Sequence, residues 1–468
     1  MKHLPARLIF HGMVRGATRS AAVLTIALAA AGASAHAQAP PPPLSLGAVL
    51  DSVTARYPLV LAAQAQIRAA QGSRVTAGAF GNPILGYQVG YNVDNALAPG
   101  GSAARVLDRE ADWTLTLPLE PLYQRGPRVR GADAQVRAAT NDAQAERQRA
   151  ALDATQAYYR TALAEVGVGT ARDLVVWLDS LVAYNRSRAA EGVAAGADLI
   201  RTEVERDRAA ADATVQEAEL AQAKADLAAF VGTPSAAAPL LSVVIYAHPL
   251  ALPSALTPSV RSGTSAQVTG GAELRAQALD RRPDVRAARE RVAAASASVS
   301  SERALVLRQF GLTLGTRRTV GTTSLIAGVS LPIPVFDLNR GEIARAEAQR
   351  DAATYQLAAD ERSVNAQVSG AYEAARLLTE RATSMASDSE GFLARADEAR
   401  RITLGAYREG AVPLFQVLDA ARAWNAAQLT YYQILFAQQQ SVLALAFAEG
   451  HDLLAIVPAL TPPITPNQ

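Results

Sequence analysis

The sequence predicts a mainly α-helical protein with four membrane β-strands, built from two copies of one half-protein. Gly192 and Gly410 lie as far apart along the chain as Gly232 and Gly450 do, which indicates a duplication. Four short stretches alternate between large apolar residues and small or polar ones, the period of a β-strand. Residues 128–233 contain no proline and are rich in Ala, Glu, Arg and Gln, which predicts long helices.

Further sequence pairs align the two halves. Leu117-Pro118-Leu119 and Leu331-Pro332-Ile333 each end an alternating stretch, and Tyr57-Pro58 corresponds to Arg282-Pro283. Each half therefore reads as helix, two strands and a long helical hairpin. We expect a signal peptide at 1–37, a first repeat at 38–232, an inter-repeat segment at 233–275, a second repeat at 276–450 and a tail at 451–468.

The first 37 residues have the three parts of a cleaved signal peptide. Four basic residues precede an apolar run from Ala21 to Ala33, and Ala35-His36-Ala37 forms a cleavage site. The alternative, a membrane anchor, needs a longer apolar run. The whole sequence has 45 basic and 43 acidic residues, so without the four basic residues of the signal peptide it is slightly acidic. This charge argues against nucleic-acid binding. The sequence contains no cysteine, so it predicts stabilisation by packing or assembly and no lipid anchor.

The alternating stretches run from Ile84 to Val93, Trp113 to Leu119, Phe310 to Gly315 and Leu325 to Leu331. A soluble sheet would show the same alternation, but about ten residues is also the length of a membrane strand. On the membrane interpretation, the large face meets lipid. We expect interfacial aromatic residues at Tyr87, Tyr91, Trp113 and Phe310. Loops are expected at 94–110 and 317–323.

Long helices surround these strands. We expect a helix over 44–79 that is interrupted at Tyr57-Pro58, a turn bracketed by Pro121 and Pro127, and kinks near Gly167 and Gly169. The hairpin tips are expected at 192–196 and 409–413, and the helices of the second half at 340–408 and 414–449. Four strands cannot close a barrel, and open strand edges in lipid are costly. A membrane sheet of this kind must therefore be shared between chains, with the helices forming a second, helical barrel.

Several segments resemble the TolC family of outer-membrane channel proteins. They are SLIAGVSLPIPVFDLNRGEIARAEAQRDAA (324–353), ALDRRPDVRAARERVAAA (278–295) and 406–450. GNPILGYQ (81–88) and NRGEIARAEAQ (339–349) are closer to the branch that serves heavy-metal efflux pumps. The resemblance covers roughly 44–455. It implies a homotrimer with a twelve-stranded barrel, four strands per chain, in the outer membrane of a Gram-negative bacterium, continued by a helical tunnel in the periplasm.

The resemblance also implies partners and functional positions. The partners are a periplasmic adaptor, an inner-membrane pump of the RND type and outer-membrane lipid, and the candidate substrates are metal cations or small toxic compounds. The hairpin tips that contact the adaptor match Glu191, Gly192, Val193, Glu409, Gly410 and Ala411. Gate positions match Asp198, Tyr407 and Asp419. Gln416 replaces one of two acidic residues, and Val412 replaces a latching Arg, which puts a double acidic ring and a salt-bridged latch in doubt.

Other interpretations of these positions stay open. Asp198 and Asp419 are equally consistent with capping or solvating a helix start. Tyr407 is expected to pack at the tip rather than to form a gate hydrogen bond. No nucleophile motif, phosphate loop or metal-ligand spacing occurs, so the sequence predicts no enzyme activity, no cofactor and no metal site. The alternative function is a periplasmic coiled-coil adaptor or scaffold protein without a pore. Such an adaptor would contain one helical hairpin, whereas this chain repeats it.

Overall fold

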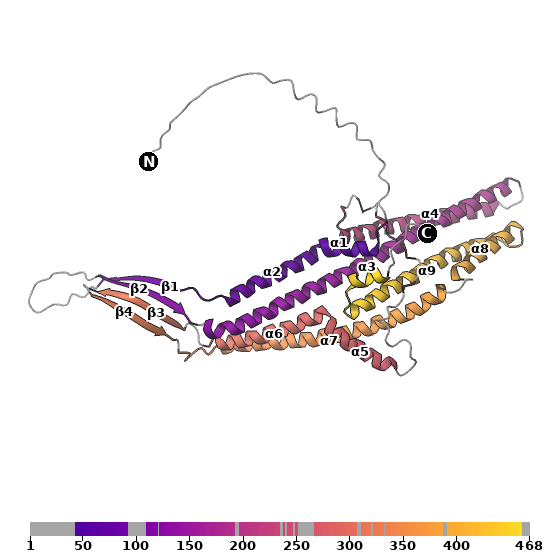
Figure 1. Ribbon diagram of the computed structural model, residues 1–468. Helices are drawn as coiled ribbons and strands as arrows, with labels where there is room; N and C mark the ends of the chain where they lie inside the picture. Colours follow the sequence, from indigo (N-terminus) through magenta and orange to yellow (C-terminus); the bar gives the residue numbers. More distant parts are fainter. Residues whose placement is uncertain are drawn as a thin grey trace, which may run out of the picture. The chain divides into compact units, whose positions relative to one another are not determined.

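The computed structural model describes residues 43–91, 109–119, 121–191, 196–234, 237–238, 241–246, 249–250, 266–306, 310–319, 322–331, 333–386 and 391–460. They belong to one compact unit, Pro43–Gln468, whose long helices run side by side with a single sheet at one end of them (Figure 1). The expected signal peptide, the tip residues Gly192 and Val193 and the end of the expected tail lie outside the described residues.

The order of elements repeats along the chain. The first half contains α1 (Leu46–Arg56), α2 (Pro58–Gly78), β1 (Ile84–Tyr91), β2 (Arg109–Pro118), α3 (Pro121–Ala190) and α4 (Gly196–Val231). The second half contains α5 (Ala266–Arg281), α6 (Pro283–Ala304), β3 (Gly311–Thr319), β4 (Thr322–Ser330), α7 (Arg340–Ala386), α8 (Phe392–Arg408) and α9 (Leu414–Ala448). A short helix, α10 (Leu453–Leu460), ends the described chain.

The two breaks before proline have the same local structure. Tyr57 has φ −67° and ψ 125°, and Arg282 has φ −65° and ψ 124°. Extended backbone is what a following proline imposes, and the proline then begins the next helix. Each of these residues also packs on an aromatic ring near the end of its hairpin: Tyr57 stacks on Phe230 at 5.2 Å, and the Arg282 guanidinium lies 5.3 Å from the centre of the Phe447 ring. The duplication therefore extends to packing.

Glycines with positive φ end both helices of the second hairpin. Gly410 (φ 76°) follows α8, and Gly450 (φ 80°) follows α9. In both places the residue after the glycine donates a backbone hydrogen bond across the last turn, His451 N to Ala446 O at 2.9 Å and Ala411 N to Ala406 O at 2.8 Å. This is the Schellman arrangement, which glycine adopts without a steric penalty.

The four strands form one antiparallel sheet in the order β1-β2-β3-β4. The middle pair joins the two halves of the chain, with Leu115 opposite Leu314 and Asp112 opposite Arg317. Within the described residues, β1 and β4 each have a neighbour on one side only. The sheet follows α2 and α6 and precedes α3 and α7, with between two and nine residues in each connection.

Several expected boundaries are wrong. Pro127 does not bracket a turn: α3 starts at Pro121 and continues through Pro127, which lies beyond the first turn and costs the helix one backbone hydrogen bond. Gly167 and Gly169 lie within the same continuous helix, and the kinks expected near them stay a prediction. The expected helix 340–408 is two helices: α7 ends at Ala386, and α8 begins at Phe392 after its N-cap residue Gly391.

The strands are longer than predicted at the loop end. β2 begins at Arg109, β3 extends to Thr319, and β4 begins at Thr322, so most of the expected loop 317–323 is strand. Phe310 precedes β3 rather than lying in it, although its carbonyl accepts a hydrogen bond from Leu119 N at 2.7 Å. The apolar alternation does not reach these strand ends, because charged residues occupy both faces there, with Arg317 on one face of β3 and Arg318 on the other.

The largest hydrophobic cluster lies in the middle of the helical region. It joins α1, α3, α9 and α10 around the buried rings of Tyr158, Tyr159 and Phe436. The Tyr158 hydroxyl donates to the carbonyl of Val244 at 2.7 Å, and Gln438 bonds both backbone groups of Leu250, so the inter-repeat chain is packed at these points. Among the described helices, none alone is long and apolar enough to span a membrane, and α1 with α2 meets that test only as a pair bent by 40°.

Candidate functional site

The two helical hairpins, α3–α4 and α8–α9, pack together through a hydrophobic cluster close to their tips (Figure 1). α3 has 70 residues, so this end is roughly 100 Å from the sheet at about 1.5 Å per residue. The cluster contains Leu178 and Leu181 of α3, Tyr407 of α8, and Val417 and Leu418 of α9. The hairpins of the two repeats are thereby brought together within one chain.

A buried hydrogen-bonded chain crosses this cluster. The Tyr407 hydroxyl donates to Asn185 Oδ1 at 2.9 Å, and Asn185 Nδ2 donates to Thr202 Oγ1 at 2.9 Å. Thr202 Oγ1 then donates to the carbonyl of Asp198 at 2.7 Å. Asn185 and Thr202 are fully buried, so every link removes a polar group that would otherwise be unsatisfied. The chain therefore ties α8 to α3 and α3 to the first turn of α4.

Tyr407 packs at the tip, as expected, and also forms this hydrogen bond. Burial raises the pKa of its phenol, and the negative charge of Asp198 raises the pKa further. The hydroxyl therefore stays protonated and can donate. Asp198 and Tyr407, two gate positions of the sequence analysis, lie near each other.

Arginines and aromatic rings reinforce the same junction. The guanidinium of Arg188 lies 5.6 Å from the centre of the Tyr184 ring and 5.8 Å from that of Tyr407. Farther from the tip, Arg400 of α8 lies 4.2 Å from the Trp424 ring of α9 and 5.7 Å from the Trp177 ring of α3. Such cation–π contacts stabilise helix packing by about 0.5–2 kcal/mol each.

An ion pair also joins the two hairpins, between α9 and α4. Arg422 of α9 bonds Glu205 of α4 through two nitrogens, with Nε 2.7 Å from Oε1. The hydrogen bond and charge of Arg422 lower the pKa of Glu205 below its usual range despite partial burial. Asp419 lies one turn before Arg422, and its charge also acts on that guanidinium.

Asp419 and Gln416 are both exposed on α9, one turn apart. α9 begins at Leu414 after Pro413, so Asp419 lies beyond the first turn and does not cap this helix. Asp198 does lie in the first turn of α4, where the helix dipole favours a carboxylate.

At the tips, Glu191, Glu409, Gly410 and Ala411 are exposed. Gly192 and Val193, the other two expected adaptor contacts, lie outside the described residues. The half-buried Val412 packs against the tip cluster.

Sequence reasoning missed Asn185, Thr202, Glu205 and Arg422. One signal was present for the ion pair: Glu205 and Arg422 occupy almost equivalent places in the two repeats and have opposite charges. For Asn185, the signal was an amide side chain on a long helix. The apolar residues around it come in part from the second hairpin, which lies beside this helix only in the folded protein. Periodicity within one helix does not show which face will meet the second hairpin.

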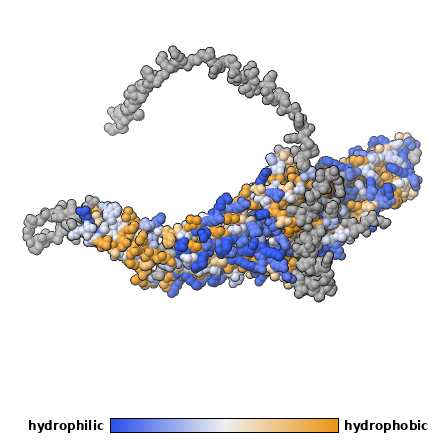
Figure 2. Space-filling model, in the orientation of Figure 1, coloured by the Kyte–Doolittle hydropathy of each residue, from blue (hydrophilic) through white to orange (hydrophobic). Residues whose placement is uncertain are grey.

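The sheet has two chemically different faces. Large apolar side chains occupy one face, with Leu85 68%, Trp113 50% and Leu325 82% exposed. The Tyr87 and Trp113 rings lie 4.5 Å apart on this face, whereas the side chain of Tyr91 is outside the described part. Orange surface gathers over this end of the molecule in Figure 2. The opposite face contains glycine, threonine, serine and the charged residues Glu110, Asp112 and Arg317.

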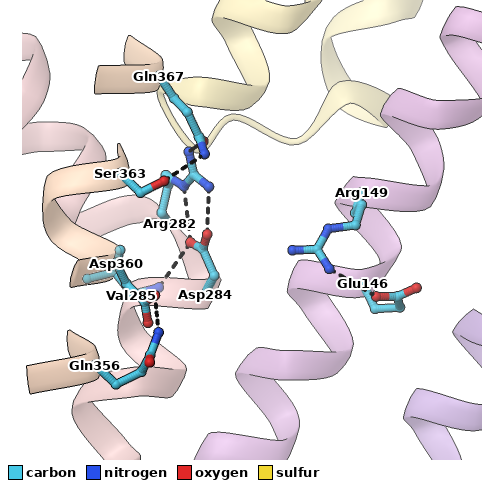
Figure 3. Close-up of polar contacts among 9 residues, drawn as sticks. All are labelled: Glu146, Arg149, Arg282, Asp284, Val285, Gln356, Asp360, Ser363 and Gln367. Carbon is cyan, nitrogen blue, oxygen red and sulfur yellow. Dashed lines mark hydrogen bonds and ion pairs between the residues drawn. The ribbon is translucent and has the colours of Figure 1, made fainter. Parts of the chain in front are cut away.

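A polar pocket of about 390 Å³ lies between α3, α6 and α7. The buried Arg282 bonds Asp284 through two nitrogens, at 3.0 and 2.6 Å, and donates to Gln367 Oε1 at 2.7 Å (Figure 3). Arg149 and Glu146 face the pocket from α3 (Figure 3). Through these hydrogen bonds, Arg282 joins the start of α6 to α7. Among the described residues, no group of three or more acidic or histidine side chains could hold a metal ion.

Known proteins match this architecture. The model of a family described as outer membrane efflux protein matches residues 49–233 and 274–451. The solved outer-membrane channel OprN is 19% identical, with a TM-score of 0.69, and the match covers 87% of this chain and 90% of OprN. CusC, whose structures concern folding and transmembrane channel formation, is 17% identical, with a TM-score of 0.68 and coverage of 87% and 92%. The outer membrane protein VceC of Vibrio cholerae is also 17% identical, with a TM-score of 0.68 and coverage of 87% and 96%. No curated protein matches the sequence.

Proposed function

The chain belongs to the outer membrane efflux protein family, and we propose that three copies of it form the exit channel of a tripartite efflux system. The observation that carries this proposal is the sheet, which has one exposed apolar face and two edges that pair with no strand of the described residues. An open edge in lipid leaves backbone groups unsatisfied, at several kcal/mol each. Three sheets joined edge to edge would close a twelve-stranded barrel, with the apolar face toward lipid.

The helices would continue this barrel into the periplasm of a Gram-negative bacterium. Exposed apolar residues of the helices, such as Val176, Ile200, Val204 and Phe415, supply surface for neighbouring copies. The channel itself would be passive and would have no catalytic role. An inner-membrane pump of the RND type would supply the energy, and a periplasmic adaptor would contact the exposed tips near Glu191 and Gly410. Metal cations are one candidate substrate class, supported by the sequence motifs of the heavy-metal branch, and small toxic compounds are the other.

The hairpin junction would serve as the closed end of the tunnel. Asp198, Tyr407, Gln416 and Asp419 would surround the constriction, and three exposed Asp419 carboxylates would form one acidic ring that favours cations. Opening would require the two hairpins of each chain to separate. The Tyr407 hydrogen-bonded chain and the Arg422–Glu205 ion pair resist that separation.

The direct test is to purify the protein from outer membranes in detergent and measure its mass and its conductance in planar bilayers. We expect a trimer, heat-modifiable migration on gels and discrete conducting steps. A protein that is stable as a monomer in buffer without detergent would overturn the proposal. The adaptor or scaffold alternative predicts that result.

Two variants test the finer assignments. Asp419→Asn should reduce cation preference, measured as the reversal potential in a salt gradient, and an unchanged potential would remove the acidic ring. A bulky residue at Gly192 or Gly410 should weaken crosslinking to the adaptor. Crosslinking at the wild-type yield in both tip variants would show that the tips are not the contact.

A further inference from the structure

Charged side chains on the small-residue face of the sheet gather at one end of the strands. Glu110 and Asp112 lie on β2, and Arg317 lies opposite Asp112 on β3. Further along the same face, the opposing pairs are small: Thr114 faces Gly315, and Thr116 faces Thr313. The Thr116 and Thr313 hydroxyls lie 3.1 Å apart. The charges are therefore confined to one level of this face.

That level lies at the end of the sheet away from the helices. β1 and β2 are joined beyond Tyr91 and Arg109, and β3 and β4 are joined beyond Thr319 and Thr322. Asp112 lies three residues inside this end, roughly 10 Å at about 3.3 Å per residue. If the sheet spans the outer membrane with its helices in the periplasm, as the proposed function requires, the charged level is the outer mouth of the pore.

The ion pair presents its two partners unequally. Arg317 Nε lies 3.0 Å from Asp112 Oδ1, and Nη2 lies 2.8 Å from Oδ2. The Asp112 side chain is only 14% exposed, whereas that of Arg317 is 51% exposed. The guanidinium thus covers the carboxylate, and a solute on this face meets the positive partner first. Arg318, the next residue, is also exposed but lies on the opposite, apolar face because side chains alternate along a strand.

We propose that Arg317 is a selectivity residue of the outer mouth, where three copies form a ring that contacts anionic groups of passing solutes. This inference rests on the proposed channel function and adds a second charged level, separate from the acidic ring at Asp419. Among the described side chains of this face, each chain contributes two carboxylates and one guanidinium at this level. The ring keeps the mouth from becoming strongly cation-selective.

The size of the effect follows from Coulomb's law. One unit charge about 10 Å from an ion in water changes the local ion concentration about twofold. Salt screening reduces the combined effect of three copies. Removing the guanidinium should therefore raise the permeability ratio of K⁺ to Cl⁻ by about two- to fivefold. Neutralising Asp112 instead should move the ratio in the opposite direction.

The absence of cysteine from the sequence allows a direct test. Arg317→Cys channels are studied in planar bilayers under a KCl gradient, first unmodified and then treated with a cationic or an anionic thiol reagent. We expect the unmodified variant to be more cation-selective than wild type. The cationic reagent should return the ratio toward wild type, and the anionic reagent should raise it further. Arg318→Cys, on the lipid-type face, is the matched control and should respond to neither reagent.

The outcomes separate this inference from the function on which it rests. Conducting Arg317→Cys channels with the wild-type ratio, unresponsive to both reagents, would overturn the inference and leave the channel function intact. An equal response from Arg318→Cys would also overturn it. A wild-type chain that does not conduct would overturn both. If Arg317→Cys does not assemble, Asp112→Asn provides the readout, and a shift away from Cl⁻ or no shift would contradict the proposal.

Discussion

At the scale of single residues, the junction between the two hairpins depends on a few buried polar side chains. Tyr407, Asn185 and Thr202 form a directed chain of hydrogen bonds inside an apolar cluster. A buried polar group left without its partner costs about 1–3 kcal/mol. These residues therefore contribute more to the choice between closed and separated hairpins than exposed charges nearby.

Tyr407→Phe tests this contribution. The substitution keeps the ring in the cluster but leaves Asn185 Oδ1 without its donor, at about 1–3 kcal/mol per chain. We expect the open probability of single channels to rise by about tenfold, which corresponds to about 1.4 kcal/mol. Tyr431→Phe on α9 is the matched control, because the Tyr431 hydroxyl makes no hydrogen bond within the described residues. An open probability equal in both variants would contradict the prediction.

The Glu205–Arg422 pair predicts a dependence on pH. Because Arg422 lowers the pKa of Glu205 in the folded protein, the pair stabilises the closed junction above the unfolded-state pKa, about 4.3. This stabilisation is lost as the pH falls through the lowered folded-state pKa. Spin labels on cysteines at Glu191 and Glu409 should therefore move apart in acid. Glu205→Gln should show the larger separation already at neutral pH, and a pH response that the substitution leaves unchanged would assign the titration to another group.

At the scale of elements, the two halves have the same arrangement of helices and strands but different side chains at equivalent positions. Both have a break before proline and an aromatic ring beneath the preceding residue, but the first half uses Tyr57 and the second uses Arg282. The arginine adds hydrogen bonds that join α6 to α7 (Figure 3). α3 is continuous where the second half is divided into α7 and α8.

Arg282→Met tests the importance of this network for stability. The arginine is buried, and its removal takes the charge partner from the Asp284 carboxylate and the donor from Gln367 Oε1, so we expect a loss of about 3 kcal/mol in the free energy of unfolding. The control is Arg289→Ala on the same helix, whose ion pairs with Asp280 and Glu361 are exposed and contribute about 1 kcal/mol or less. Denaturant unfolding of both variants decides the question, and equal losses would count against the network.

At the scale of the whole molecule, the sheet is incomplete in one chain. Its apolar face is exposed and both edges are open within the described residues. Assembly in lipid would satisfy both, because the face would be covered by acyl chains and the edges by neighbouring strands. The same arrangement would direct the glycine and threonine face toward the pore.

Leu314→Arg tests which face meets lipid. An arginine on the lipid face near the membrane middle costs about 2–4 kcal/mol, so the variant should accumulate poorly as trimers in the outer membrane. Thr313→Arg, one residue earlier and on the other face, should still assemble but should conduct less. Poor assembly of Thr313→Arg together with normal assembly of Leu314→Arg would reverse the assignment of the faces.

The sequence by itself determined the duplication, the four strands, their two faces and the long hairpins. These features follow from short-range patterns, a period of two residues, the absence of proline and the positions of glycine. Only the tertiary structure decided that Asn185 bonds Tyr407, that Glu205 pairs with Arg422 and that Asp112 faces Arg317. Each of these contacts joins residues more than 200 positions apart, where no local pattern specifies which helix face or strand register will meet its partner.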